Sequence, residues 1–180
     1  EGDLSVDVVI IGGGFSGEST AVELCEKGYE VALVDANRIS WGASGRNGGQ
    51  LQGGLGHNPA AFRGTIGDAG VNEIYAMGEE CVDIVTERIK KYNIDCDLKW
   101  GYVEVALRPR HLRYYEEWAK EDGKLVLLDK EALKAYVNSE TYLGGYYKPD
   151  WGHLHPLNLC IGEARAAEEA GIDLLLVRDF

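Results

Sequence analysis

The sequence predicts an α/β fold, and three features of the chain support this class. The first 35 residues read as a short apolar strand, a glycine turn, a helix and a second strand. After residue 150 the chain returns to a helix followed by an apolar strand. Residues 61–149 have a mixed α+β pattern instead. We therefore predict one domain from residues 1–60 and 150–180, with residues 61–149 inserted as a second lobe.

Composition narrows the classes of function. The 180 residues are 45% hydrophobic, which is too apolar for a disordered chain. The formal net charge of −12 disfavours both nucleic acid and an anionic membrane surface as partners, because either needs clustered Lys and Arg. No apolar run approaches the roughly 18 residues of a membrane span, so we expect none.

The N-terminal elements follow from short-range patterns. Residues Val6–Ile11 are β-branched and almost continuously apolar, which predicts a strand buried on both faces of a parallel sheet. Residues Ser16–Lys27 have helical spacing, and Gly28 is a suitable C-terminal stop. Glu30–Val34 form a second buried strand that ends at Asp35. Because β-α-β crossovers are right-handed, these two strands should be parallel neighbours.

The rest of the chain divides by the same criteria. We predict a long amphipathic helix at 70–92, a charged helix at 109–120 and a helix at 157–170 that Gly171 ends. A short helix is expected at 130–137. Strands or extended segments are predicted at 100–107, 125–128, 142–147 and 172–177. Residues 38–56 are glycine-rich without apolar periodicity, and a long irregular stretch inside a domain is usually functional.

The turn after the first strand has the pattern GxGxxG, formed by Gly12, Gly14 and Gly17. The pattern lies between a strand and a helix, as a Rossmann-like dinucleotide-binding fold requires. A diphosphate would lie at the helix N-terminus, where free N–H groups and the helix dipole favour an anion. Asp35 can accept a hydrogen bond from a ribose hydroxyl, and its charge disfavours NADP. The alternative is an ordinary β-α turn whose glycines only relieve strain.

Glu18 is an unusual residue so close to the glycine turn. It places an acid in the first turn of the helix, where a phosphate would approach. We expect its side chain to point to solvent, and a carboxylate that faced the phosphate instead would weaken binding.

Two segments together carry a resemblance to a known family. Residues 6–20 read VDVVIIGGGFSGEST, and residues 35–50 read DANRISWGASGRNGGQ. These segments closely resemble the D-amino-acid-oxidase-like family of FAD-dependent oxidoreductases, in the branch of gamma-glutamylputrescine oxidase-like enzymes. The segment WGHLHP at 151–156, followed by a helix, is also similar to that family. Members of the family are considerably longer, so the chain resembles an N-terminal part of them.

The resemblance implies that the chain binds FAD without a covalent link, and that residues 61–149 are part of a substrate or cap lobe. The implied cofactor-binding residues fall in three segments: Gly12, Gly13, Gly14, Phe15, Ser16 and Gly17; Asp35, Ala36, Asn37 and Arg38; and Ser44, Gly45, Arg46, Asn47, Gly48, Gly49, Gln50 and Leu51. The first would hold the diphosphate and the second the adenosine. The third would run towards the flavin, with Arg46 supplying a fixed positive charge.

The resemblance also implies an activity. Members of the family oxidise an amine carbon by hydride transfer to the flavin, and dioxygen or another acceptor takes the electrons. The substrate would be a small amine or amino acid, and no catalytic residue is assigned. Two alternatives remain, an NAD-dependent dehydrogenase and an inactive, truncated dinucleotide-binding fragment. The glycine-rich segment argues against the dehydrogenase, because NAD domains normally pass quickly to further β-α units.

Other candidate residues have simpler interpretations. His153 and His155 lack the additional ligands of a metal site, so we predict hydrogen-bonded loop histidines and no bound metal. An aromatic group at 142–151 (Tyr142, Tyr146, Tyr147 and Trp151) is expected to pack in a core rather than line a pocket. Cys25 and Cys160 are predicted to be buried in helices. The four cysteines form no CxxC pair, and no signal peptide is apparent, so we expect the reducing cytoplasm.

Overall fold

The computed structural model describes residues 3–56, 58–171 and 173–176, and its contacts divide the chain into two compact units. The first unit contains Glu1–Gly49, Asp83–Leu98 and Leu154–Phe180, and the second contains Gln50–Val82 and Lys99–His153. Residues 83–98 thus group with the N-terminal segment, a different division from the predicted inserted segment of 61–149. No helix in the described ranges has the length and apolar character that crossing a membrane requires.

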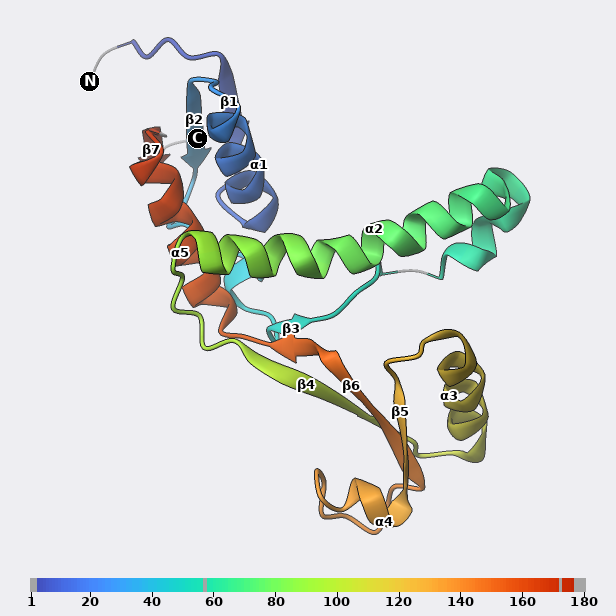
Figure 1. Ribbon diagram of the computed structural model, residues 1–180. Helices are drawn as coiled ribbons and strands as arrows, with labels where there is room; N and C mark the ends of the chain where they lie inside the picture. The colour runs from blue at the N-terminus through green and yellow to red at the C-terminus, as the bar shows by residue number, and fades with distance from the viewer. Residues whose placement is uncertain (1–2, 57, 172, 177–180) are drawn as a thin grey trace. The chain divides into compact units, whose positions relative to one another are not determined.

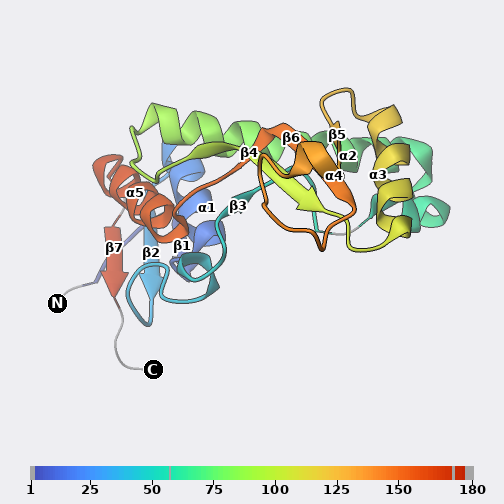
Figure 2. The same cartoon turned by 90° about the horizontal axis from the view of Figure 1, so that it is seen from below.

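The first unit contains the predicted βαβ arrangement. Its elements are β1 (Val8–Ile11), α1 (Phe15–Glu26), β2 (Val31–Asp35), the 3-10 turn η1 (Ala43–Gly45), the last part of α2 (Arg63–Lys91), α5 (Pro156–Glu169) and β7 (Asp173–Leu176). The sheet has the order β1-β2-β7 and both pairings are parallel. Figure 2 shows β2 and β7 side by side and pointing in the same direction. This confirms the predicted parallel arrangement of the first two strands.

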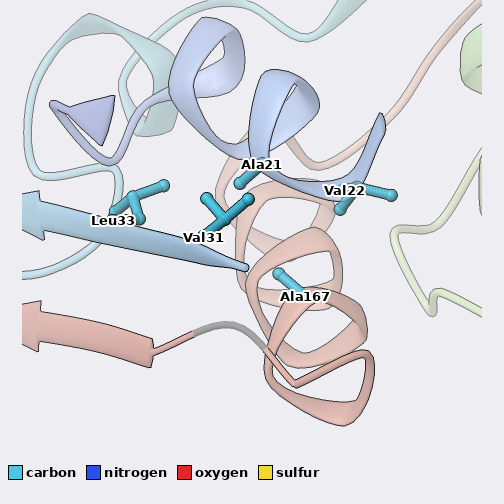
Figure 3. Packing of buried hydrophobic residues seen from close by; sticks show 5 residues of the cluster. All are labelled: Ala21, Val22, Val31, Leu33 and Ala167. Atoms are coloured by element: carbon cyan, nitrogen blue, oxygen red, sulfur yellow. The ribbon is translucent and has the colours of Figure 1, made fainter. Parts of the chain in front are cut away.

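The core of the first unit forms where α1 and α5 cover the sheet (Figure 3). Ala21 of α1 and Val31 and Leu33 of β2 are almost completely buried, and Ala167 of α5 packs against the same cluster. Small side chains on both helices allow the backbones to approach the strands closely. Burial of this apolar area stabilises the unit by about 25 cal/mol per Å². The turn that follows β1 is therefore attached to a sheet that packs against both helices.

One prediction for β1 is wrong. The strand was expected to be buried on both faces, but Val9 is 58% exposed and Ile11 is 85% exposed. Side chains alternate between the two faces of a strand. Val8 and Ile10 pack against the core cluster, whereas Val9 and Ile11 point to the other face, which the described residues leave open.

The second unit is built on a four-stranded antiparallel sheet around β6 (Gly144–His153). The other elements are β3 (Gln50–Leu51), the 3-10 turn η2 (Pro59–Phe62), the first part of α2, β4 (Lys99–Val105), α3 (Pro109–Glu121), β5 (Val126–Asp129) and α4 (Lys130–Leu133). Strands β3, β4 and β5 all pair with β6 (Figure 1). Two expected elements have different bounds, because the segment at 142–147 belongs to the longer β6 and the short helix at 130–137 ends at Leu133.

Aromatic packing and a buried lysine fix the second unit. Tyr146 contacts Trp118 of α3 edge-on at 5.2 Å between ring centres, and Trp118 contacts Trp151 at 5.6 Å. Core packing was expected for this group, and the burial of Tyr146 and Trp151 confirms it for these two residues. Beside them the buried ammonium of Lys148 contacts Asp122 at 2.9 Å and Asp150 at 2.8 Å.

Helix α2 belongs to both units and confirms the predicted amphipathic helix. Gly67, with φ of 69°, interrupts its helical geometry near the N-terminus, so the regular helix begins close to the predicted position. Only glycine adopts this backbone conformation without strain. The helix ends at Lys91, within one residue of the prediction.

Candidate cofactor-binding site

The glycine turn joins β1 to α1 with the geometry that the motif predicts. Gly12 has φ of 108°, and its amide donates to the Val34 carbonyl at 2.8 Å. Gly14 precedes the helix in an extended conformation without a side-chain cap. A Cβ on Gly17 would lie 1.9 Å from the Gly12 carbonyl oxygen. Gly17 is thus required for the close approach of helix and turn.

The start of α1 presents several backbone amides that have no hydrogen-bond acceptor among the described residues. Among the described residues, no acceptor is assigned to the amides of Gly14, Ser16 and Gly17. The Phe15 amide donates to the Ser44 hydroxyl oxygen at 3.0 Å. Unsatisfied N–H groups and the positive end of the helix dipole together favour an anion here. A hydroxyl both accepts and donates, so Ser44 can hold Phe15 and still donate to an anion.

Asp35 ends β2 beside this turn, as predicted. Its Oδ2 atom accepts the Gly13 amide at 2.7 Å, and its Oδ1 atom accepts the Asn37 amide at 2.6 Å. An ionised carboxylate has about four acceptor positions, so two remain after these bonds. Asp35 is half-buried, and the remaining positions suit a sugar hydroxyl.

Ser40 fixes the other side of the turn, and sequence reasoning missed it. Its amide donates to the Gly13 carbonyl at 2.6 Å, and its backbone has φ of 54° in the left-handed region. Its hydroxyl donates to Glu18 Oε1 at 3.1 Å. Ser40 is almost fully buried. A left-handed non-glycine residue is the kind of signal that only a structure reveals.

Glu18 does not point to solvent, so that prediction is wrong. The side chain is completely buried, and its Oε2 atom has no hydrogen-bond partner in the part of the chain that the structure describes. Burial raises the pKa of Glu18 to about 8, although the bond from Ser40 opposes this and the carboxylates of Glu163 and Asp35 add to it. Helix α1 turns this position inward, because Ala21 and Val22 share the buried side of the helix.

A separate polar network lies near Glu18 in the interior of the unit. Arg88 of α2 donates to Glu163 of α5 at 3.2 Å, to Ser19 at 2.7 Å and to Glu23 at 2.9 Å. Burial raises the pKa of Glu163, while Arg88 lowers it. Cys160 of α5 is buried as predicted, and burial raises the pKa of its thiol to about 12. The prediction for Cys25 is only partly correct, because this residue is half-buried.

The glycine-rich segment is an ordered loop around η1. Asn47 donates to the carbonyls of Ala43 and Ser44 and accepts the Gly49 amide at 2.8 Å. Gly49 has φ of 70°, and a Cβ there would lie 2.0 Å from the Leu154 carbonyl. The Arg46 guanidinium lies 4.4 Å from the centre of the Trp41 ring. The position of the Arg46 guanidinium is therefore fixed by Trp41 of the same loop.

Most of the predicted site residues belong to one compact unit, but two of them belong to the other. The residues from Gly12 to Gly17, Asp35 to Arg38 and Ser44 to Gly49 belong to the first unit. Ala36, Asn37, Arg38, Arg46, Asn47 and Gly48 are exposed there. Gln50 and Leu51 belong to the second unit, where they form β3 and pair with His153 and Gly152 of β6.

Structural contacts are found for one of the two histidines and for one of the remaining aromatic residues. His155 caps α5 by accepting the Asn158 amide on Nδ1 at 3.2 Å, which confirms the predicted hydrogen-bonded role. His153 is exposed at the end of β6. Tyr147 stacks on Tyr136, and Tyr142 is half-buried. No group of three or more His, Cys, Asp or Glu side chains in the described ranges is placed to hold a metal ion.

Comparison with known proteins identifies a family and several relatives. The family model described as "DAO: FAD dependent oxidoreductase" matches residues 7–177. The chain is 40% identical over 174 residues to "Probable oxidoreductase OrdL" of Haemophilus influenzae, covering 93% of this chain and 40% of that protein. It is 40% identical over 168 residues to "Gamma-glutamylputrescine oxidoreductase" of Escherichia coli, covering 91% of this chain and 39% of that protein. The chain thus spans about two fifths of the length of these curated relatives.

Solved structures share the fold at lower identity. Glycine oxidase from Bacillus cereus has a TM-score of 0.74 and 24% identity, covering 96% of this chain and 46% of that chain. L-Amino acid deaminase from Proteus myxofaciens has a TM-score of 0.77 and 23% identity, covering 98% and 39%. At this identity the likeness describes the fold alone.

Proposed function

Because the chain belongs to the family of FAD-dependent oxidoreductases, we propose that its first unit binds the ADP part of FAD. The observation that carries this proposal is the set of unsatisfied amides at the start of α1, beside a carboxylate at the end of β2. Gly14, Ser16 and Gly17 would donate to the diphosphate, and Ser44 would add its hydroxyl. Asp35 would accept a ribose hydroxyl. We retain FAD rather than NAD as the cofactor because the matching family is FAD-dependent.

The remaining predicted residues have supporting roles in this proposal. Ala36, Asn37 and Arg38 are exposed after Asp35 and would lie near the adenine end. The loop from Ser44 to Gly49, with Gln50 and Leu51 after it, would run towards the flavin. Its internal bonds through Asn47 support a preformed backbone, which lowers the entropic cost of binding. The assignment of the second unit to a substrate or cap lobe is part of the same proposal.

We further propose that the whole protein oxidises an amine or amino acid. FAD, when bound, supplies the hydride acceptor, and dioxygen or another acceptor takes the electrons. The support is the 40% identity to the gamma-glutamylputrescine oxidoreductase of E. coli together with the family match. The protein's own described groups contribute binding and orientation of the cofactor. A reducing, cytoplasmic location belongs to this proposal, and the four free cysteines are consistent with it.

Flavin reduction by candidate substrates tests the proposed activity. The purified chain is loaded with FAD and mixed anaerobically with gamma-glutamylputrescine, simple amines or amino acids, and the absorbance at about 450 nm is followed. Bleaching by an amine or amino acid supports an oxidoreductase of this substrate class. Bound FAD that none of these compounds reduces would support the alternative of an inactive, truncated fragment.

A further inference from the structure

The buried residue Glu18 belongs to the same helical turn as the amides of the proposed diphosphate site. Glu18 follows Gly17 in the first turn of α1, and its side chain is completely buried. Acidic residues in a first helical turn usually face solvent, where they interact favourably with the helix dipole. A buried acid at this position places a titratable group close to the amides that would bind an anion.

The surroundings of Glu18 do not neutralise a negative charge. The loop contributes the Ser40 hydroxyl at 3.1 Å, α5 contributes Cys160 and Glu163, and the end of β2 contributes Asp35. Two of these neighbours are acids. The nearby cation, Arg88 of α2, is bonded to Glu163, Glu23 and Ser19. Among the described residues no cation forms an ion pair with Glu18, and its Oε2 atom has no partner.

Glu18 is also connected to the glycine turn through hydrogen bonds of Ser40. The Ser40 hydroxyl donates to Glu18, while the Ser40 amide donates to the Gly13 carbonyl at 2.6 Å. A charge on Glu18 would therefore act on the turn in two ways. It would repel a bound diphosphate through a low-dielectric interior. A buried carboxylate would also have to be solvated by water or by reoriented protein dipoles. Either change would displace Ser40 and disturb its bond to the Gly13 carbonyl.

We propose that Glu18 is a proton-controlled positioning residue of the glycine turn, which binds the FAD diphosphate more tightly when Glu18 is neutral than when it is ionised. This inference rests on the proposed function, and it adds regulation of cofactor binding by pH. The pKa of about 8, raised mainly by burial, places the change close to neutral pH. An apolar or amide side chain at the same position would remove the control.

The test measures the dissociation constant of FAD by calorimetry between about pH 6 and pH 9 at constant ionic strength. The wild-type chain should bind FAD roughly tenfold more weakly at the upper end than at the lower. Glu18→Gln mimics the neutral acid and should change by less than about twofold. Glu30→Gln removes the same charge from an exposed residue of the same unit. The dissociation constant of this control should depend on pH as that of the wild type does. Ser40→Ala removes the bond that lowers the pKa, so its transition should shift to higher pH.

Each outcome has a separate meaning. A Glu18→Gln profile that follows the wild type would overturn this inference while leaving FAD binding intact. Absence of FAD binding in every variant at every pH would remove the proposed function and this inference with it. Circular dichroism checks the fold of each variant. If Glu18→Gln does not fold, Glu18→Leu, which carries no charge at any pH, must show the flat profile for the inference to stand.

Discussion

The carboxylate of Asp35 accepts the Gly13 amide at 2.7 Å, so the acid that ends β2 also fixes the glycine turn that follows β1. Gly13 lies in the turn just after β1 and Asp35 is the last residue of β2, so the bond joins the C-terminal ends of two adjacent parallel strands. The same carboxylate is the proposed ribose acceptor. One residue thus has a structural role in the free protein and a binding role in the complex, and the two roles can be separated by experiment.

Removing the Asp35 carboxylate should therefore destabilise the free protein as well as weaken FAD binding. In Asp35→Ala the Gly13 and Asn37 amides lose their acceptor, and we expect the free energy of unfolding to fall by about 1–3 kcal/mol without cofactor. Urea unfolding measures this change. Asp3→Ala, at an exposed position, is the control. Equal unfolding curves for Asp35→Ala and the control would show that the bond contributes nothing to stability.

The close approach of α1 and the turn predicts a large effect at Gly17. In Gly17→Ala the new methyl group would lie 1.9 Å from the Gly12 carbonyl oxygen, so helix and turn must separate. We expect a loss of about 2 kcal/mol or more in the free energy of unfolding. Gly42→Ala is the matched control, because no atom lies within 4 Å of the new methyl group. A Gly17→Ala protein as stable as Gly42→Ala would contradict the close approach.

Burial of Glu18 predicts a specific dependence of stability on pH. Its pKa rises from an ordinary 4.5 to about 8 on folding, so the folded state binds the proton more tightly than the unfolded state. The contribution is fully present below about pH 4.5 and is lost as the pH rises through about 8. The wild type should thus lose on the order of 2–4 kcal/mol relative to Glu18→Gln across this range.

Paired urea titrations of the two proteins measure this difference, and they require no cofactor. Glu163 also has a raised pKa and is present in both proteins, so the difference reports the titration of Glu18 together with its coupling to Glu163. A constant difference between the wild type and Glu18→Gln from about pH 4.5 to pH 9 would mean that Glu18 is not buried as a neutral acid.

The second unit predicts a destabilising substitution that is independent of the cofactor. Lys148→Met removes the ammonium that the Asp122 and Asp150 carboxylates share, and it leaves two partly buried acids without this partner. We expect a loss of about 2–4 kcal/mol in the free energy of unfolding. Lys120→Met removes an exposed ion pair with Glu117 and should leave stability nearly unchanged. Thermal unfolding of both variants measures the two losses. Equal losses for Lys148→Met and Lys120→Met would contradict the greater contribution expected of the buried ion pairs.

The strand–turn–helix–strand unit was predictable from the sequence because its signals are local. Continuous β-branched residues, glycines at fixed spacing and the acid at 35 each act within a few residues, and the structure has the expected elements at these positions. The exposure of Val9 and Ile11 was not predictable, since it depends on which parts of the chain cover the second face of the sheet.

The contact between the glycine turn and Asp35 was predictable from the sequence, but the buried groups beside the turn were not. The predicted turn and Asp35 meet as expected, whereas the burial of Glu18 contradicts the rule that acids near a helix start face solvent. Its neighbours Ser40, Cys160 and Glu163 are brought together by long-range folding. Local patterns also gave no reason to group residues 83–98 with the N-terminal segment, although Arg88 in that range bonds to α1 and α5.

The most direct measurement is a calorimetric titration of the chain and of its Gly14→Val variant with FAD, with and without excess ADP. A side chain on Gly14 would meet the Ser44 hydroxyl oxygen at 2.8 Å and occupy the approach to the free amides of α1. We predict that the wild type and the folded control Gly42→Ala bind FAD, that ADP competes, and that Gly14→Val has lost binding. FAD binding by Gly14→Val with wild-type affinity would contradict the proposed site.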